Sequence, residues 1–281
     1  MTPLPNNIFT ITSNNPGPTV AIFGGVHGNE RAGILAIDAL RETLAIDRGT
    51  VYLVYANPKA ITANQRLLKQ NLNRLFLRGN TVATYEEKRA NELMDLLDTC
   101  DALLDLHSYN DVQENANIFA ICEENCSSVA QALGIPFRIS GFTATEAGGS
   151  DGYMYLNNKV GVCVELGSIN LSESMSQEGV AIAQRFLQYL GCIEGNNIQP
   201  TSTQTALTAN IMYKKQTDDF RFTQPFNTLN PVAKGTVIAI DGPTEIIADQ
   251  NVYILFPRTQ FAIGTEAFIL VNAVNSHHTH A

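Results

Sequence analysis

Short apolar segments alternate with longer amphipathic segments over the first 190 residues, and this alternation limits the fold more than any other feature of the sequence. The short segments are rich in Val, Ile, Leu and Phe, and several of them are apolar on both faces. Strands that are buried on both faces belong to mainly parallel sheets that helices cover. The strands predicted in this way are residues 7–12, 19–24, 50–55, 102–106, 116–121 and 160–165.

The longer segments have the periodicity of amphipathic helices. In one of them Ile34, Ile37 and Leu40 recur at helical spacing, with polar residues between them. The alternation of strands and helices predicts an α/β domain over residues 1–195, with a mainly parallel mixed sheet flanked by helices. The predicted helices are residues 30–45, 84–99, 125–133 and 173–190.

The pattern changes after residue 190. Residues 191–205 are polar and contain Gly and Pro, as linkers between domains commonly do. Residues 206–281 then consist of short strand-like segments separated by turns, without a long helical pattern. We therefore expect a small all-β C-terminal domain, a barrel or a sandwich, over residues 206–281.

The composition argues against several classes of protein. Hydrophobic residues make up 44% of the 281 residues, which is ample for a packed core and speaks against disorder. Lys and Arg number 18 against 27 Asp and Glu, a net charge of −9, so we expect no nucleic-acid partner. No apolar stretch reaches the roughly 18 residues that span a bilayer, and the first residues lack a signal-peptide pattern. We therefore expect a cytoplasmic protein without a membrane partner.

Two further features of the composition bear on assembly and on redox state. Charged residues make up only 16% of the chain, which leaves room for a subunit interface and so for a homo-oligomer. The five cysteines are odd in number and lie mostly among apolar neighbours, as reduced thiols do. Cys122 and Cys126 have a C-x3-C spacing that could clip a metal ion, but no second pair or nearby His completes such a site. We interpret them as thiols at a strand end and in the helix that follows.

Chemically reactive side chains lie at the ends of three predicted buried strands, where α/β sheets bind their ligands. His27 and Glu30 are three residues apart where a strand turns into a helix, so that both side chains can face one point. His107 follows the second strand, with Asp105 on the same face to support its imidazole. Glu165 ends the third strand, where a buried carboxylate must be paired, coordinated or shifted in pKa.

Each of these segments has an ordinary structural explanation when it is taken alone. Glu30 could complement a helix N-terminus, His107 could cap a strand end, and Glu165 could pair with a helix or loop. Taken together, two His and one Glu are a ligand set of catalytic zinc, which leaves a fourth position for water. A second Glu that is held off the metal would then serve as a general base.

The sequence resembles the succinylglutamate desuccinylase/aspartoacylase family, a branch of the zinc carboxypeptidase clan. The match extends over residues 18–190, and the β-rich C-terminal part is also similar to the C-terminal domain of that family. The resemblance implies a zinc-carboxypeptidase-like fold and a zinc-dependent hydrolase that cleaves the amide bond of an N-acyl amino acid or a similar small carboxylate-bearing amide. The matching segments, in the order of the family, are GGVHGNERAG, NPKAITANQRLLKQNLNRLF, LLDLHS and VCVELG.

The resemblance also implies the roles of individual residues in catalysis. His27, Glu30 and His107 match the ligands of one zinc ion per chain. Glu165 matches the catalytic glutamate, which takes a proton from the zinc-bound water and later gives it to the leaving amine. Arg66 matches the arginine that helps zinc to stabilise the developing oxyanion.

The small-molecule carboxylate substrate has its own matching residues. Asn73 and Arg74 match the pair that grips a substrate carboxylate, which an arginine can hold with two parallel hydrogen bonds. Outside the context of the family, a surface ion pair would be the simpler explanation for Arg66 and Arg74. We also expect the loop of residues 141–150 to border the substrate pocket.

The sequence departs from the family pattern at two positions. The family commonly has Asp where Asn71 stands, and in the related carboxypeptidases that Asp lies behind a zinc-bound His. A neutral amide can orient an imidazole but adds no negative charge, which bears on metal affinity. Members that act on acetylaspartate carry an arginine ten residues before the catalytic Glu, where it holds a second carboxylate. Here that residue is Tyr155, which we assign to substrate binding in its place.

Two alternative functions use the same residues. A metallocarboxypeptidase that acts on peptide C-termini would bind the terminal carboxylate with Asn73 and Arg74. A non-catalytic metal-binding or ligand-binding relative would keep the fold and lose turnover, but the complete ligand set and the presence of Glu165 argue against it.

Overall fold

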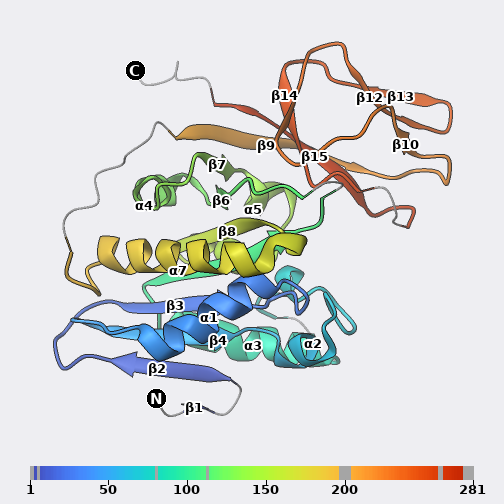
Figure 1. Cartoon of the computed structure of the whole chain (residues 1–281). Helices are drawn as coiled ribbons and strands as arrows, with labels where there is room; N and C mark the ends of the chain where they lie inside the picture. The colour runs from blue at the N-terminus through green and yellow to red at the C-terminus, as the bar shows by residue number, and fades with distance from the viewer. Residues whose placement is uncertain are drawn as a thin grey trace.

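The computed structural model describes residues 3–4, 7–79, 82–111, 114–195, 204–258 and 262–274, and Figure 1 shows their arrangement. The strands are β1 (Pro3–Leu4), β2 (Ile8–Thr12), β3 (Thr19–Gly24), β4 (Thr50–Tyr55), β5 (Ala102–Tyr109), β6 (Phe119–Ile121), β7 (Phe137–Ser140), β8 (Val160–Ser168), β9 (Thr205–Lys214), β10 (Arg221–Phe222), β11 (Asn230–Val232), β12 (Val237–Asp241), β13 (Thr244–Ile247), β14 (Val252–Leu255) and β15 (Glu266–Ala273). The helices are α1 (Arg31–Thr43), α2 (Pro58–Ala63), α3 (Tyr85–Asp98), α4 (Ser127–Ala132), α5 (Phe142–Thr145), α6 (Ser150–Leu156) and α7 (Ser172–Tyr189), with the 3-10 helices η1 (Leu72–Arg74), η2 (Glu124–Cys126) and η3 (Ile169–Leu171).

One long sheet runs through the described residues, with the strand order β1-β2-β4-β3-β5-β8-β6-β7-β9-β15-β14-β11. At its centre β3 pairs in parallel with β4 and β5, and β5 pairs in parallel with β8. Every position of β5 is buried. Its side chains alternate between two cores, one on each face of the sheet, as the apolar sequence of this strand predicts. The prediction of a mainly parallel mixed sheet flanked by helices is therefore confirmed.

Two layers of helices cover the N-terminal part of the sheet. The amphipathic helices α1 and α7 pack against each other on one face, in the front of Figure 1, where Ile37 and Phe186 are fully buried. On the opposite face α3 buries Leu93 and Leu97 against the strands. The hydroxyl group of Thr84 caps α3, and Glu87 completes the capping box. Three of the four predicted helices thus form over nearly the predicted residues.

The short elements differ more from the predictions. The helix predicted at residues 125–133 begins as η2 and continues as α4, and the strand predicted at residues 116–121 covers only the three residues of β6. Sequence periodicity did not predict β7, α2, α5 or α6, because segments of four to seven residues span too few turns to show a pattern.

The C-terminal part is all-β, as predicted, but it extends the main sheet. Strand β9 pairs in parallel with β7, so the hydrogen-bonded sheet continues without interruption into β15, β14 and β11. A second sheet, with the order β10-β12-β13, shares an apolar core with this extension, in which Ile238 packs with Ile254 and Phe268. The predicted linker at residues 191–205 falls largely on residues 196–203, which lie outside the described residues.

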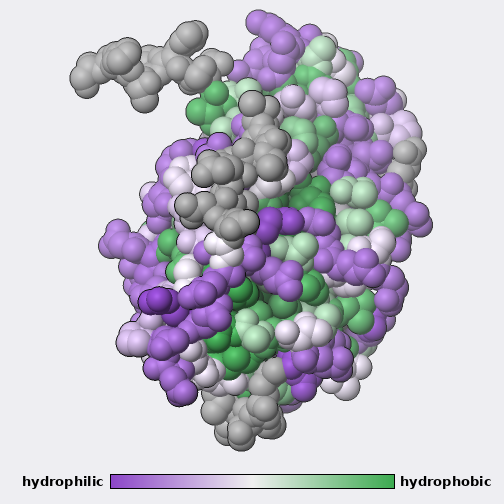
Figure 2. Space-filling view, turned by 60° about the vertical axis from the view of Figure 1, so that its left-hand side comes forward, coloured by the Kyte–Doolittle hydropathy of each residue, from purple (hydrophilic) through white to green (hydrophobic). Residues whose placement is uncertain are grey.

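Burial and surface character agree with the composition. The five cysteines are free and buried, which agrees with the interpretation of Cys122 and Cys126 as ordinary thiols. Hydrophilic residues form much of the face that Figure 2 shows, with hydrophobic residues visible between them. Among the helices of the described ranges, none is both long enough and apolar enough to cross a membrane.

Candidate active site

The reactive residues meet at the carboxyl ends of the central strands. The loop between β3 and α1 carries His27 and Glu30, and His107 lies near the end of the neighbouring strand β5. Glu165 on β8 stands directly opposite His107 in the parallel register, although the two residues are 58 positions apart (165 − 107). The hydrogen-bond register of three adjacent strands therefore brings these four side chains to one edge of the sheet.

Two glycines allow the first loop to approach its neighbours closely. A Cβ atom on Gly28 would lie 2.1 Å from the carbonyl carbon of Ala60 in α2. A Cβ atom on Gly33 would lie 2.4 Å from the carbonyl oxygen of Leu106 in β5. Since neither position tolerates a side chain, these glycines hold the loop and the start of α1 against the sheet.

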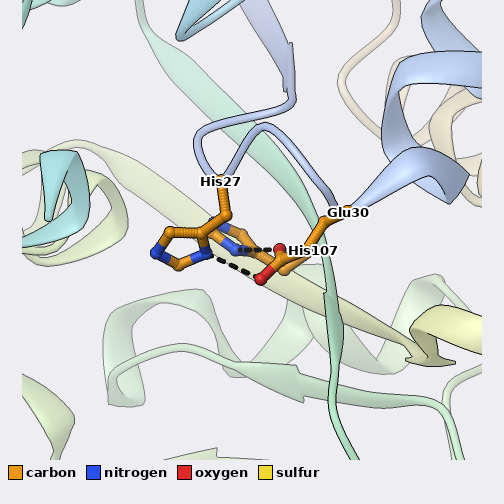
Figure 3. Close-up of side chains that lie close together, drawn as sticks. All are labelled: His27, Glu30 and His107. Atoms are coloured by element: carbon orange, nitrogen blue, oxygen red, sulfur yellow. Dashed lines mark hydrogen bonds and ion pairs between the residues drawn. The ribbon is translucent and has the colours of Figure 1, made fainter. Parts of the chain in front are cut away.

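The three predicted metal ligands come together at this point (Figure 3). Glu30 is the residue that precedes α1, but its side chain makes no capping hydrogen bond and turns toward the two imidazoles. Its Oε1 lies 2.8 Å from Nδ1 of His27, and its Oε2 lies 2.9 Å from Nδ1 of His107. All three side chains are buried, and their donor atoms lie within 4.8 Å of one another. The structure thus forms a compact His-Glu-His group.

The far nitrogen of each imidazole faces an oxygen acceptor. Nε2 of His27 lies 2.9 Å from Oδ1 of Asn71, and Nε2 of His107 lies 3.1 Å from Oδ2 of Asp105. Because the amide oxygen of Asn71 only accepts, His27 carries a proton on Nε2. The ring of His107 lies between two carboxylates and donates a hydrogen bond from Nδ1 to Oε2 of Glu30. Asn71 therefore stands behind His27 as predicted, and Asp105 supports His107 as predicted. The hydroxyl group of Ser150 donates to Asp105 and fixes it in turn.

The charges in this group favour a cation at its centre. Burial alone would lower the pKa of His107, but the carboxylates of Asp105 and Glu30 outweigh it and hold that pKa well above its usual value. Burial would raise the pKa of Glu30, yet the two imidazoles hold it well below its usual value. Burial lowers the pKa of His27, whose Nδ1 has no hydrogen-bond partner among the described residues. A bound cation would displace the proton from Nδ1 of His107. Two imidazole nitrogens and one carboxylate are then a donor set of catalytic zinc, so the residues present fit that ion.

Glu165 lies beside the group without belonging to it. Its side chain is buried, and its Oε2 has no hydrogen-bond partner among the described residues. Burial, the largest influence, raises the pKa of Glu165 to about 8, although nearby His107 opposes the shift. A carboxyl group with a pKa near neutrality is suited to taking up and returning a proton.

These four residues line a cavity of about 290 Å³, and three further predicted residues line it with them. Nη1 of Arg66 lies 2.7 Å from Oε1 of Glu30. Oδ1 of Asn73 accepts a hydrogen bond from the backbone of Ser150 at 3.2 Å. Arg74 donates to the backbone oxygen of Asn73 and forms an ion pair with Glu146. The residues proposed to hold the substrate therefore face the same space as the metal ligands.

Tyr155 is the predicted residue that the structure does not bring to the cavity. Its side chain lies on α6 and is 39% exposed, whereas the neighbouring Tyr153 and Leu156 line the cavity. Successive residues of a helix point about 100° apart, so a count of ten residues back from Glu165 does not fix which side chain faces inward.

Four charged residues of the cavity were not predicted from the sequence, and one of them is Asp151 on α6. Glu146 lies in the loop that was predicted to border the pocket, and that loop does line it. Arg258 and Glu266 come from the C-terminal part of the chain, more than 90 positions after Glu165 (258 − 165 = 93). No local pattern around these residues marks them, because only the pairing of β9 with β7 brings that part of the chain to the site.

The fold and the site together fit one class of protein, a hydrolase built on an α/β sheet with a buried His-Glu-His group that could hold a metal ion. The model of the succinylglutamate desuccinylase/aspartoacylase catalytic domain matches residues 16–190. The match covers more than half of the chain, and the chain belongs to the succinylglutamate desuccinylase/aspartoacylase family. It is accordingly an amidohydrolase of the type that deacylates N-acyl amino acids.

Individual relatives agree with this assignment. A probable aspartoacylase of Nostoc sp. is 24% identical over 265 residues, which are 81% of this chain and 88% of that protein. The N-alpha-acetyl-L-2,4-diaminobutyric acid deacetylase of Halomonas elongata is 30% identical over 216 residues, which are 70% of this chain and 62% of that protein. The match thus spans less than two thirds of the Halomonas protein.

The likeness in fold extends beyond the catalytic domain. The solved structure of succinylglutamate desuccinylase from Vibrio cholerae superposes with a TM-score of 0.78 at 19% identity, covering 96% of this chain and 86% of that one. The product-bound ectoine utilization protein EutE from Ruegeria pomeroyi superposes with a TM-score of 0.75 at 24% identity, covering 94% and 88%. The C-terminal strands therefore belong to the shared fold.

Proposed function

We propose that this protein is a zinc-dependent deacylase that hydrolyses the amide bond of a small N-acyl amino acid. His27, Glu30 and His107 would hold one zinc ion per chain. The observation that carries the proposal is the buried group of these three residues, with the uncoordinated carboxyl group of Glu165 on the neighbouring strand. Three donors leave a coordination position open for water, which distinguishes a catalytic zinc site from a structural one.

Proton transfer is the task of Glu165. A zinc ion held by the three ligands would lower the pKa of a water molecule to about 7 and polarise the scissile carbonyl group. Glu165 takes a proton from the attacking water and gives it to the leaving nitrogen, which would otherwise depart as an unstable anion. Its buried position, with one oxygen free of hydrogen bonds, supports this role.

Cationic and amide side chains orient the substrate. Arg66 lies against Glu30 at the edge of the cavity, where its guanidinium group can stabilise the negative charge that develops on the carbonyl oxygen. Asn73 and Arg74 lie further along the cavity lining and are placed to bind the carboxylate of the amino acid. The amide bond then lies between a fixed carboxylate and the proton-transferring Glu165.

The size of the cavity favours small amides over peptides. Its volume of about 290 Å³ is at the lower end of the range for ligand pockets. The relatives named above include a deacetylase of N-alpha-acetyl-L-2,4-diaminobutyric acid, and a relative from Rattus norvegicus is named N-acyl-aromatic-L-amino acid amidohydrolase. Both names describe removal of an acyl group from an amino acid, which supports a deacylase rather than a carboxypeptidase.

The proposal is tested by metal content and by substrate range. Elemental analysis of tag-free protein should find about one zinc per chain, and His107→Ala should lose it. The zinc-loaded protein should hydrolyse members of a panel of N-acetyl and N-succinyl amino acids faster than a matched series of dipeptides and tripeptides. Rates that hold up with peptide length would favour the carboxypeptidase alternative. Zinc-free protein after reconstitution, or an inert panel, would contradict the proposal.

Location and assembly remain predictions. We propose a cytoplasmic location, which the five free, buried cysteines support. A homo-oligomer stays a prediction that light scattering would test.

A further inference from the structure

The cavity contains a carboxylate that the proposed reaction does not use. Glu266 is the first residue of β15, and it lines the cavity from the C-terminal part of the chain. Its side chain is only 10% exposed, and its Oε1 has no hydrogen-bond partner among the described residues. Nη2 of Arg258 lies 3.6 Å from that oxygen, which is too long for a hydrogen bond. A buried carboxylate oxygen without a hydrogen bond is costly, unless a ligand donates to it.

A second carboxylate lies near Glu266. Glu146 follows α5, lines the same cavity and forms an ion pair with Arg74. Burial is the main reason why the pKa of Glu266 is raised, and the charge of Glu146 raises it further. The charges of Arg258, Arg74 and Arg66 oppose that shift, so Glu146 and these three cations all lie within electrostatic reach of Glu266.

Substrate binding changes the balance of charge at this end of the cavity. In the proposed function Arg74 binds the carboxylate of the substrate, and Glu146 then loses its ion-pair partner. Of the other cations that act on Glu266, Arg66 is already paired with Glu30, which leaves Arg258 for the two carboxylates. With a neutral substrate side chain, the two carboxylates leave one uncompensated negative charge in the cavity, and an acidic side chain adds a further negative charge. A positively charged side chain compensates it.

We propose that Glu266 and Glu146 form an acidic subsite that binds a positively charged side chain of the substrate. The preferred substrate is then an Nα-acyl derivative of a basic amino acid, with an ammonium or guanidinium group beyond the scissile amide. The inference rests on the proposed function, because it needs Arg74 to hold the substrate carboxylate. It also assigns a role to the C-terminal strands, because Glu266 on β15 would select the substrate.

The experiment compares substrates that differ only in the terminal charge of the side chain. Nα-acetyl-L-ornithine is paired with Nα-acetyl-L-norvaline, and Nα-acetyl-L-lysine with Nα-acetyl-L-norleucine. We expect kcat/KM to be about tenfold or more higher for the basic member of each pair, because the ion pair forms in a desolvated cavity. Nα-acetyl-L-glutamate should be the poorest substrate. Glu266→Gln keeps the size of the side chain, removes its charge and should bring the basic-to-neutral ratio close to one.

A matched control and a binding measurement complete the test. Glu245→Gln makes the same change at an exposed position of β13 and should leave the ratio as it is. Equal or lower kcat/KM for the basic substrates, or an unchanged ratio in Glu266→Gln, would overturn the inference. Calorimetric binding of the same pairs to Glu165→Gln, and to Glu165→Gln combined with Glu266→Gln, reports the preference without turnover. If nothing is hydrolysed but the basic ligands bind more tightly through Glu266, the deacylase proposal fails and the acidic subsite stands.

Discussion

The two ends of the cavity are built in different ways. At one end, called the metal end here, the proposed metal ligands His27, Glu30 and His107 are almost fully buried beside adjacent parallel strands, and each imidazole has a partner behind it. At the substrate end Arg74 and Glu146 come from loops and short turns, are partly exposed, and pair with each other. The first end is held by backbone hydrogen bonds, and the second by ion pairs that a ligand can replace.

This difference suits the metal end to the chemical reaction and the substrate end to the selection of the substrate. A metal site and a general base work only when their atoms are held within a fraction of an ångström, which strands in fixed register provide. Selection of a substrate needs groups that can exchange partners, which side chains on loops provide. We therefore expect substitutions at the metal end to change the rate of reaction, and substitutions at the substrate end to change affinity.

The largest effect should come from Glu165, the proposed proton-transferring residue. Glu165→Gln removes the base but none of the three metal donors, so kcat should fall about a thousandfold while zinc content stays the same. Steady-state kinetics and elemental analysis on one preparation measure both quantities. Glu173→Gln, at an exposed position of α7, is the matched control. Loss of zinc together with activity would mean that Glu165 belongs to the metal site itself.

The next effect should appear at the substrate end. Arg74→Ala removes the partner of the substrate carboxylate, and KM should rise about a hundredfold with little change in kcat. Arg74→Lys keeps the charge but loses the two parallel N–H donors of the guanidinium group. Its KM should lie between the values of the parent protein and of Arg74→Ala. Arg48→Ala, at an exposed position, is the control. A fall in kcat at unchanged KM would mean that Arg74 acts in the chemical step. It would contradict the expectation that the substrate end affects only affinity.

A smaller effect, on zinc affinity, should come from Asn71 at the metal end. Asn71→Asp keeps the oxygen that faces Nε2 of His27 and adds a negative charge, so zinc should bind about tenfold more tightly. Asn71→Ala removes the oxygen and should weaken binding. Competition with a chromophoric chelator measures both affinities. If Asn71→Asp binds zinc no better than the parent protein, the charge behind His27 is irrelevant and only the orientation of the ring matters.

The smallest effect concerns the stability of the C-terminal part and its dependence on pH. Burial would raise the pKa of Asp241, but hydrogen bonds from the side chain and backbone of Thr217, the backbone of Gln216 and the hydroxyl group of Tyr213 lower it overall. A carboxyl group with a lower pKa in the folded chain stabilises the fold above its unfolded value of about 4, and this contribution disappears as the pH falls through the folded pKa.

Asp241→Asn should therefore lower the free energy of unfolding at pH 7 by about 2 kcal/mol. The difference between the variant and the parent protein should shrink below pH 4, where the parent loses the same contribution. Urea unfolding at several pH values measures it, with the exposed Asp249→Asn as the control. A difference that does not depend on pH would mean that packing, rather than the charge of Asp241, stabilises this part.

The sequence predicts a helix or strand correctly where a single hydrophobic pattern runs along the whole of that helix or strand. The apolar segments of β3, β4, β5 and β8 and the periodic helices α1, α3 and α7 follow directly from it. Much of the metal end is equally local, because His27 and Glu30 share one loop and His107 and Glu165 end buried strands. Burial on both faces forces such strands into the centre of a sheet, and a polar residue at their ends must then have a purpose.

Only the tertiary structure decided the substrate end. It placed Glu146, Arg258 and Glu266 around the same cavity and left Tyr155 outside its lining, although no spacing in the sequence indicates either result. The pairing of β9 with β7 joins what looked like a separate domain to the main sheet and carries Glu266 to the site. The physical reason is that periodicity records which face of an element is buried, whereas contacts between distant loops depend on strand pairing and on charges that meet only in the folded chain.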